Sequence, residues 1–447
     1  MPASKTPICD FVNNYAESKT TRFHMPGHKG RALLGFEAFD ITEIKGADAL
    51  YEADGIIAES EAIATELFGS GRTLFSTEGS SQCIRAMLYL CSTMEQGDEK
   101  PLIVAARNVH KAFVYAAALL DFEVKWLFPQ GDSRSLCSCI ISPELLEETL
   151  SSLSRKPVAV YVTCPDYLGG LCDIKALAEV CHRHGTLLAV DNAHGAYLHF
   201  LENSLHPLDL GADICCDSAH KTLPVLTGGA YLQISKNAPA HFALQAKQAL
   251  ELFGSTSPSY LIMQSLDCCN AYLADSYREK LAKTCRQLSS VRQKLQENGW
   301  KLEGTDPLRL TIHAPDGLSG VELAEQLRQH SIECEYADPE FLVLMATPEN
   351  SEEDFSRLLS ALGENDRPYS EKTPLPMAKA DSALSIRQAL FSPHESISSS
   401  DALGRICAAP AVSCPPAIPI AVPGEIIGET ALELCRYYGF DHLEVVK

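Results

Sequence analysis

The sequence predicts an α/β protein whose functional site lies at one edge of a mostly parallel sheet. From about residue 60 to residue 260, short continuous apolar runs alternate with helix-like stretches, which is typical of parallel strands covered on both faces. One apolar run ends abruptly in Asp191, and Lys221 follows in a segment of Ser, His and small residues. Sites in such sheets form at the carboxyl ends of strands, where Asp191 falls.

The large domain is expected at residues 46–270, after an N-terminal arm at 1–45 that lacks clear periodicity. A helix is expected over 173–185, because Asp173 stands at its start and a Gly just past its end. Expected strands are 101–106, 124–128, 157–164, 186–191 and 229–234.

A smaller α/β domain is expected at 271–370 and a C-terminal α+β domain at 371–447. Apolar residues from Leu273 to Leu295 recur every three or four positions and predict a helix that leaves the large domain. A β-α-β-α unit follows, and both of its helices open with a capping-box pattern, Ser319 with Glu322 and Ser351 with Asp354. Residues 365–381 are polar and contain Pro, as in a linker.

Composition excludes several classes of protein. A formal net charge of −21 over 447 residues argues against binding to nucleic acid or to an anionic membrane surface. The N-terminus lacks the apolar core of a signal peptide, and no apolar run approaches the roughly 18 residues of a membrane span. The 17 cysteines are odd in number and scattered through apolar runs, so we expect reduced thiols in a cytoplasmic protein.

Lys221 and Asp191 suit pyridoxal 5'-phosphate. This cofactor needs a lysine that forms a Schiff base and an acid that keeps the pyridine nitrogen protonated. Ala193 lies on the same side of the strand as Asp191, and its small side chain would let a ring lie against it. His194 either packs near the ring and positions Asp191 or has a buried structural role.

Three further segments carry candidate ligands of the cofactor. Ser80 and Ser81 open a helix whose free N–H groups would seat a phosphate, although a plain Ser-capped helix fits the same pattern. Ser218 and His220 flank Lys221 and could complete that seat. His110 starts another helix, where it would stack on the pyridine ring or remain merely solvated. Residues 254–260 could be an ordinary helix cap, and metal binding by the two histidines of 23–30 is not expected.

Several motifs, in this order, resemble the fold-type-I, pyridoxal-phosphate-dependent ornithine/lysine/arginine decarboxylases. The resemblance runs from about residue 5 to residue 430 and is that of a short form without a receiver-like wing domain. The motifs are FHMPGHKG, GADALYEADGIIAESEAIATELFGSGRTLFSTEGSS, RNVHKA, TCPDYLGGLCDI, DNAHGAY, DSAHKTLP, STSPSY and CPPAIPIAVPGEIIG. The resemblance implies an aspartate-aminotransferase-like large domain, a homodimer and a place in polyamine biosynthesis.

The resemblance also implies roles for individual residues. Lys221 would carry the cofactor, Asp191 would bind its pyridine nitrogen and His110 would stack on its ring. Ser255 or Thr256 would reach the phosphate from a neighbouring subunit, and Glu425 would lie near the substrate side chain. The residues implied around the phosphate are Ser80, Ser81, Ser218 and His220.

The sequence departs from the family pattern at three places. Asn192 stands where the family often has Glu, Glu78 where Asn is common, and Cys164 where several members have Asn or Ser. The change at Cys164 puts a hydrogen bond to the ring hydroxyl in doubt.

We therefore expect decarboxylation of arginine, lysine or ornithine to the amine and carbon dioxide, with Lys221 or His110 as the acid that protonates the α-carbon. Two alternatives stay open. An aminotransferase or lyase would keep the cofactor and could use Arg309 to clamp the substrate carboxylate. A non-catalytic homologue would regulate an active partner, against which the intact Lys221 and Asp191 argue.

Overall fold

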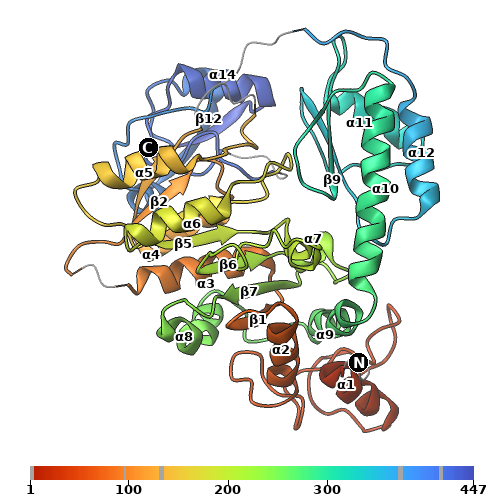
Figure 1. Cartoon of the computed structure of the whole chain (residues 1–447). Helices are drawn as coiled ribbons and strands as arrows, with labels where there is room; N and C mark the ends of the chain where they lie inside the picture. The colour runs from red at the N-terminus through yellow and green to blue at the C-terminus, as the bar shows by residue number, and fades with distance from the viewer. Residues whose placement is uncertain (1–4, 95–96, 130–134, 371–375, 412–415) are drawn as a thin grey trace. The chain divides into compact units, whose positions relative to one another are not determined.

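A computed structural model of the chain describes residues 5–94, 97–129, 135–370, 376–411 and 416–447 (Figure 1). The chain divides into two compact units. The first consists of Met1–Thr93 with Leu188–Lys280, and the second of Met94–Leu187 with Leu281–Lys447.

The first unit combines a helical N-terminal part with four strands in the order β1-β7-β6-β5. Helix α3 packs on β6 and β7, and α8 packs on α3 and β1. Its elements are α1 (Pro7–Glu17), α2 (Ile56–Leu67), β1 (Arg72–Ser76), α3 (Gly79–Ser92), β5 (Leu187–Asp191), the 3-10 helix η1 (Ala196–Phe200), β6 (Ile214–Asp217), α7 (Ala219–Thr222), β7 (Ala230–Ile234), α8 (Ala240–Glu251) and α9 (Tyr260–Ala274).

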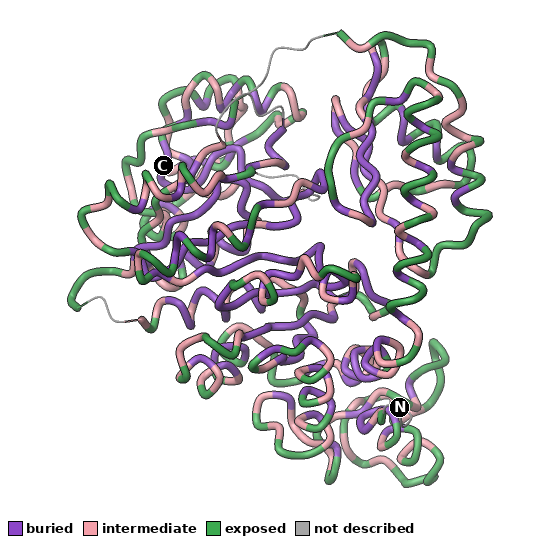
Figure 2. Tube along the Cα trace, in the orientation of Figure 1, coloured by how far each residue is buried: buried purple, intermediate pink, exposed green. Residues whose placement is uncertain are grey.

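Strand directions in the first unit place two strand ends together. β5 and β6 pair in parallel with Asp191 opposite Cys216, so both strands end at the same edge. β7 is antiparallel to β6 and to β1, a reversal that its apolar pattern could not reveal. All four strands are buried almost throughout their length (Figure 2).

The second unit holds three parallel strands in the order β4-β2-β3, an antiparallel sheet in the order β10-β11-β9-β8, and the antiparallel pair β12-β13. Its elements are β2 (Leu102–Ala106), α4 (Lys111–Leu120), β3 (Glu123–Leu127), α5 (Pro143–Ser152), β4 (Ala159–Thr163), α6 (Ile174–Arg183), α10 (Tyr277–Glu297), β8 (Leu302–Glu303), β9 (Arg309–His313), α11 (Gly320–Gln329), β10 (Tyr336–Ala337), β11 (Phe341–Met345), α12 (Glu352–Leu362), α13 (Ile386–Leu390), β12 (His394–Ser398), the 3-10 helix η2 (Ser399–Asp401), α14 (Glu429–Tyr438) and β13 (His442–Val446).

Local sequence signals locate the helices well. Asp173 caps α6 by accepting the N–H of Ala176, and both predicted capping boxes are present at α11 and α12. One prediction is wrong: the amphipathic stretch from Leu273 to Leu295 is two helices, because α9 ends at Ala274 and α10 begins at Tyr277. Backbone angles at Asp275 (φ −86°, ψ −97°) leave the helical region, which apolar spacing does not report.

Among the described residues, no helix is long and apolar enough to cross a membrane. Part of the predicted linker (371–375) and the first two residues of the CPPAIPIAVPGEIIG motif (414–415) lie outside the described residues. The division into four domains stays a prediction.

Asp267 joins the N-terminal helix α1 to helix α9 within the first unit. Its buried carboxylate on α9 accepts the N–H groups of Ile8 (3.0 Å) and Cys9 (2.9 Å) and the hydroxyl of Ser60 (2.5 Å). We expect Asp267→Asn to lower the free energy of unfolding by about 2–3 kcal/mol, because the amide turns a donor toward these donors. Urea denaturation measures the change. The same substitution at exposed Asp275, at the end of the same helix, should cost less than about 0.5 kcal/mol; equal costs would contradict the assignment.

Candidate active site

Lys221 lies in a short helix at the carboxyl edge of the first unit's strands. β6 ends at Asp217, and the four-residue helix α7 starts at Ala219. The Nζ atom of Lys221 lies 2.9 Å from Nε2 of His194, in the loop after β5. The lysine is half-buried. The structure thus brings His194 to the amine.

Asp191 ends β5 and is only 2 % exposed. Its Oδ1 accepts the N–H of Ala193 at 3.2 Å and faces the Sγ atom of Cys216 at 3.6 Å. Burial, reinforced by the nearby Asp191 carboxylate, raises the pKa of the Cys216 thiol well above its ordinary value, so Cys216 remains an S–H donor. Since Asp191 pairs opposite Cys216, the carboxylate lies one strand away from the segment that leads into Lys221.

The start of α3 presents N–H groups that have no acceptor within the helix. Ser80 and Ser81 lie in the first turn and are half-buried, and the N-cap residue is Glu78, which makes no side-chain cap bond. The expected alternative of a Ser-capped helix is therefore not what the structure contains. The Glu78 carboxylate instead accepts the N–H of Ser255 of the same chain.

Ser218 and His220, which shortly precede Lys221, are held by hydrogen bonds. Ser218 is buried, and its Oγ lies 3.4 Å from Nδ1 of His220, which also lies 3.1 Å from the carbonyl oxygen of Gly229. Ala193 is 9 % exposed and offers a small apolar surface beside Asp191. An amine, a buried acid and a helix N-terminus are the groups that pyridoxal 5'-phosphate needs, so the residues present fit this cofactor.

His110 belongs to the second unit and serves as the N-cap of α4. Its Nδ1 accepts the N–H of Ala112 at 3.1 Å, which fixes the imidazole ring and leaves Nε2 as the protonated nitrogen of the neutral form. The adjacent Lys111 donates its N–H to the carbonyl of Ala417 at 2.8 Å. The ring that was predicted to stack on the cofactor is therefore held in one orientation by its own helix.

Glu425 is buried against an arginine that the sequence reading did not single out. Its Oε2 accepts the N–H of Val422 at 2.7 Å and lies 3.3 Å from Nη2 of Arg107, and both side chains are at most 4 % exposed. Arg107 also donates to the carbonyls of Pro419 (2.8 Å) and Ile420 (3.0 Å). The only sequence signal was that Arg107 opens the RNVHKA motif.

Arg309 does not have the setting of a carboxylate clamp. It is buried, and its Nη1 donates to the carbonyls of Asp166 (2.8 Å) and Tyr167 (2.9 Å) within the second unit. Arg309, the residue offered for the aminotransferase alternative, thus has a structural task.

Cys164 is likewise buried, and its Sγ accepts the N–H of Cys172 at 3.2 Å.

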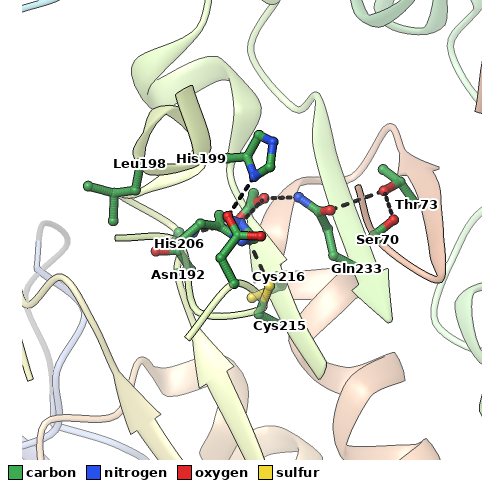
Figure 3. Close-up of polar contacts among 12 residues, drawn as sticks. Ser70, Thr73, Asn192, Leu198, His199, His206, Cys215, Cys216 and Gln233 are labelled. Carbon is green, nitrogen blue, oxygen red and sulfur yellow. Dashed lines mark hydrogen bonds and ion pairs between the residues drawn. The ribbon is translucent and has the colours of Figure 1, made fainter. Parts of the chain in front are cut away.

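A second residue that the sequence reading missed is Asp217, at the end of β6. Its carboxylate accepts the side-chain amide of Asn192 at 2.6 Å, lies 3.2 Å from Nε2 of His206 and also accepts the side-chain amide of Gln233 (Figure 3). His206, Cys215 and Asp217 have the spacing of metal ligands. The oxygens of Asp217 are taken by these donors, so we interpret the cluster as a hydrogen-bond network.

Comparison with known proteins gives matches over nearly the whole chain. Residues 6–314 match the family model described as the major domain of Orn/Lys/Arg decarboxylases, and residues 367–443 match the model of their C-terminal domain. An arginine decarboxylase of Bacillus subtilis is 30% identical, with 96% of this chain and 92% of the relative covered. An arginine decarboxylase of Halalkalibacterium halodurans is 29% identical, with coverages of 97% and 93%.

Solved structures give the same fold. The lysine decarboxylase LdcF of Francisella novicida aligns with a TM-score of 0.81 at 17% identity, covering 99% of this chain and 81% of that chain. The serine palmitoyltransferase of Sphingomonas wittichii aligns with a TM-score of 0.57 at 16% identity, covering 80% and 83%. The predicted fold class is thereby confirmed.

Proposed function

Because this chain belongs to the Orn/Lys/Arg decarboxylase family, we propose that it removes the α-carboxylate of arginine as carbon dioxide, with pyridoxal 5'-phosphate as its cofactor. The family resemblance that the motifs carried is confirmed by these matches. The observation that supports the chemistry most is the convergence of Lys221, His194 and Asp191 at the ends of neighbouring strands β5 and β6.

The cofactor would supply an acceptor for the electron pair that is released at the substrate's α-carbon. Lys221 would hold it covalently between turnovers, and Asp191 would keep a proton on its pyridine nitrogen. His194, 2.9 Å from the amine, is placed to exchange a proton with Lys221 when substrate displaces it.

The remaining residues of the proposed site bind and orient. Ser80, Ser81 and the N–H groups of α3 would hold the phosphate, with Ser218 and His220 at its other side. As the family resemblance implies, His110 would stack on the pyridine ring, and the small side chain of Ala193 would let a ring lie against it. Protonation of the α-carbon then falls to Lys221 or His110.

Arginine is the substrate we favour because the relatives from Bacillus subtilis and Halalkalibacterium halodurans, matched over nearly the whole chain, are named arginine decarboxylases. Glu425 would face the positively charged side chain, and a net charge of −21 attracts cations. The product amine would then enter polyamine biosynthesis. Free thiols throughout the described part of the chain suit the reducing cytoplasm.

The decisive assay uses purified protein reconstituted with pyridoxal 5'-phosphate and given arginine, lysine or ornithine separately. Mass spectrometry should detect agmatine and one equivalent of carbon dioxide from arginine, and little amine from the other two. A dominant cadaverine or putrescine product would show that the substrate is lysine or ornithine, respectively, and not arginine. A keto acid, or no amine from any substrate, would overturn the proposed decarboxylation.

We also propose a homodimer, with Ser255 or Thr256 reaching the phosphate of a neighbouring subunit. The N-terminal arm presents apolar side chains that a second copy would cover, among them Phe23 (93 % exposed), Leu33 (84 %) and Leu34 (78 %). Glu37 holds this loop by accepting the N–H groups of Leu33, Leu34 and Gly35. An ordered apolar loop of this kind is typical of an interface.

We expect Leu33→Glu combined with Leu34→Glu to convert the dimer to a monomer and to remove most of the activity, because four charges would have to be buried in a symmetric interface. Sedimentation velocity measures the mass. Glu66→Gln, at an exposed position of the same unit, is the control and should leave the dimer intact. A double variant that stays dimeric would contradict the role of the arm.

A further inference from the structure

The buried network around Asp217 joins the two loops that carry the proposed cofactor residues. Asp217 ends β6, four residues before Lys221, and Asn192 directly follows Asp191 at the end of β5. The Nδ2 atom of Asn192 donates to Oδ1 of Asp217 at 2.6 Å, and both side chains are fully buried. This buried side-chain hydrogen bond therefore connects the segment of the acid to the segment of the amine.

The turn that follows Asn192 packs closely against its side chain. Gly195 donates its N–H to the carbonyl of Asn192 at 2.8 Å, and a Cβ at Gly195 would lie 2.1 Å from Oδ1 of Asn192, so the turn closes tightly over this side chain. Within the turn, Ala193 donates its N–H to Asp191 and His194 contacts Lys221. Moving Asn192 would displace both contacts together.

Asp217 has donors on all sides, as a buried carboxylate requires. Besides Asn192, it accepts Nε2 of His206 at 3.2 Å and the amide of Gln233 on β7. The network continues from Gln233 to Thr73 on β1 (3.0 Å) and from Thr73 to Ser70 (2.8 Å), as Figure 3 shows. The hydrogen bonds thus run from the proposed site across β7 to β1.

We propose that Asp217 and Asn192 form a positioning pair that sets Asp191, His194 and Lys221 relative to one another for cofactor binding. The pair requires one acid and one amide: two acids would repel each other in a dry core, and two amides would leave Asp217's other donors without a charged acceptor. The inference rests on the proposed cofactor, but not on the proposed substrate.

The test measures the dissociation constant of pyridoxal 5'-phosphate by titrating apoprotein and following the absorbance of the bound cofactor. Asn192→Asp and Asp217→Asn should each weaken binding by about 10- to 100-fold, because each leaves buried groups mismatched. The exchanged pair, Asn192→Asp with Asp217→Asn, should bind no better than Asp217→Asn alone, because His206 and Gln233 would still face an amide in place of their charged acceptor.

Thr73→Val supplies the matched control, because it cuts the same network at β1, away from the site. It should lower the melting temperature of the apoprotein and leave cofactor affinity unchanged. Asn192→Ser replaces Asn192→Asp if the latter does not fold. Single variants at Asn192 and Asp217 that bind the cofactor as tightly as the parent, or a Thr73→Val variant that loses affinity equally, would overturn the positioning role. Cofactor binding by the parent without amine formation would instead contradict the proposed reaction alone.

Discussion

Lys221→Ala is expected to lower the turnover number by at least about 10⁴-fold, because it removes the amine that would hold the cofactor and return a proton. Lys221 is half-buried and its Nζ lies 2.9 Å from Nε2 of His194, and no neighbouring backbone group can supply an amine in its place. The absorbance of covalently bound cofactor should vanish with the activity. Borohydride reduction followed by peptide mass spectrometry should label a peptide containing residue 221 in the parent and none in the variant.

Lys236→Ala is the matched control, since Lys236 is an exposed lysine in the same unit. Its activity and labelling should equal those of the parent. Label at residue 236, or a Lys221→Ala protein that retains the covalent absorbance, would place the cofactor elsewhere and refute the proposed site.

Much of the fold can be predicted from the sequence, because its signals are local. The strands at 101–106 and 186–191 were marked by short apolar runs, and the two capping boxes by residues three positions apart. Strand direction is a different matter. β7 has the apolar pattern of its parallel neighbours and still runs antiparallel, because pairing depends on connections that periodicity does not encode.

The candidate site divides in the same way. Lys221 and Asp191 were recognisable because each stands out from its local sequence, as a charged residue at the end of an apolar run or among small residues. The residues that hold Lys221 and Asp191 in place were not recognisable, because the role of a buried polar residue depends on the partners that it contacts in the folded chain. Asp217 binds Asn192 across a separation of 25 residues in the sequence, and Arg107 binds Glu425 across a separation of 318 residues. No spacing rule reaches such distances.

Arg107→Met is expected to lower the free energy of unfolding by about 3–5 kcal/mol, because it leaves the carboxylate of Glu425 buried beside no cation. Arg107 and Glu425 are 2 % and 3 % exposed, and the guanidinium also lies 5.3 Å over the ring of Trp126. Denaturant unfolding measures the loss. Arg155→Met breaks ion pairs of a partly exposed arginine with the exposed Glu99 and Glu123 in the same unit and should cost less than about 1 kcal/mol.

The double variant Arg107→Met with Glu425→Met separates the two tasks of this pair. Two apolar side chains of similar volume can replace a buried ion pair at little cost, so stability should recover the part of the loss that comes from the uncompensated charge. The carbonyls of Pro419 and Ile420 and the N–H of Val422 stay without these partners, so recovery should be partial. Activity toward arginine should be lost in the double variant, because the proposed acidic partner of the substrate side chain is gone. A stable double variant that decarboxylates arginine normally would show that Glu425 only fastens the 419–425 segment to Arg107, and the partner of the cationic side chain would then have to be another acid.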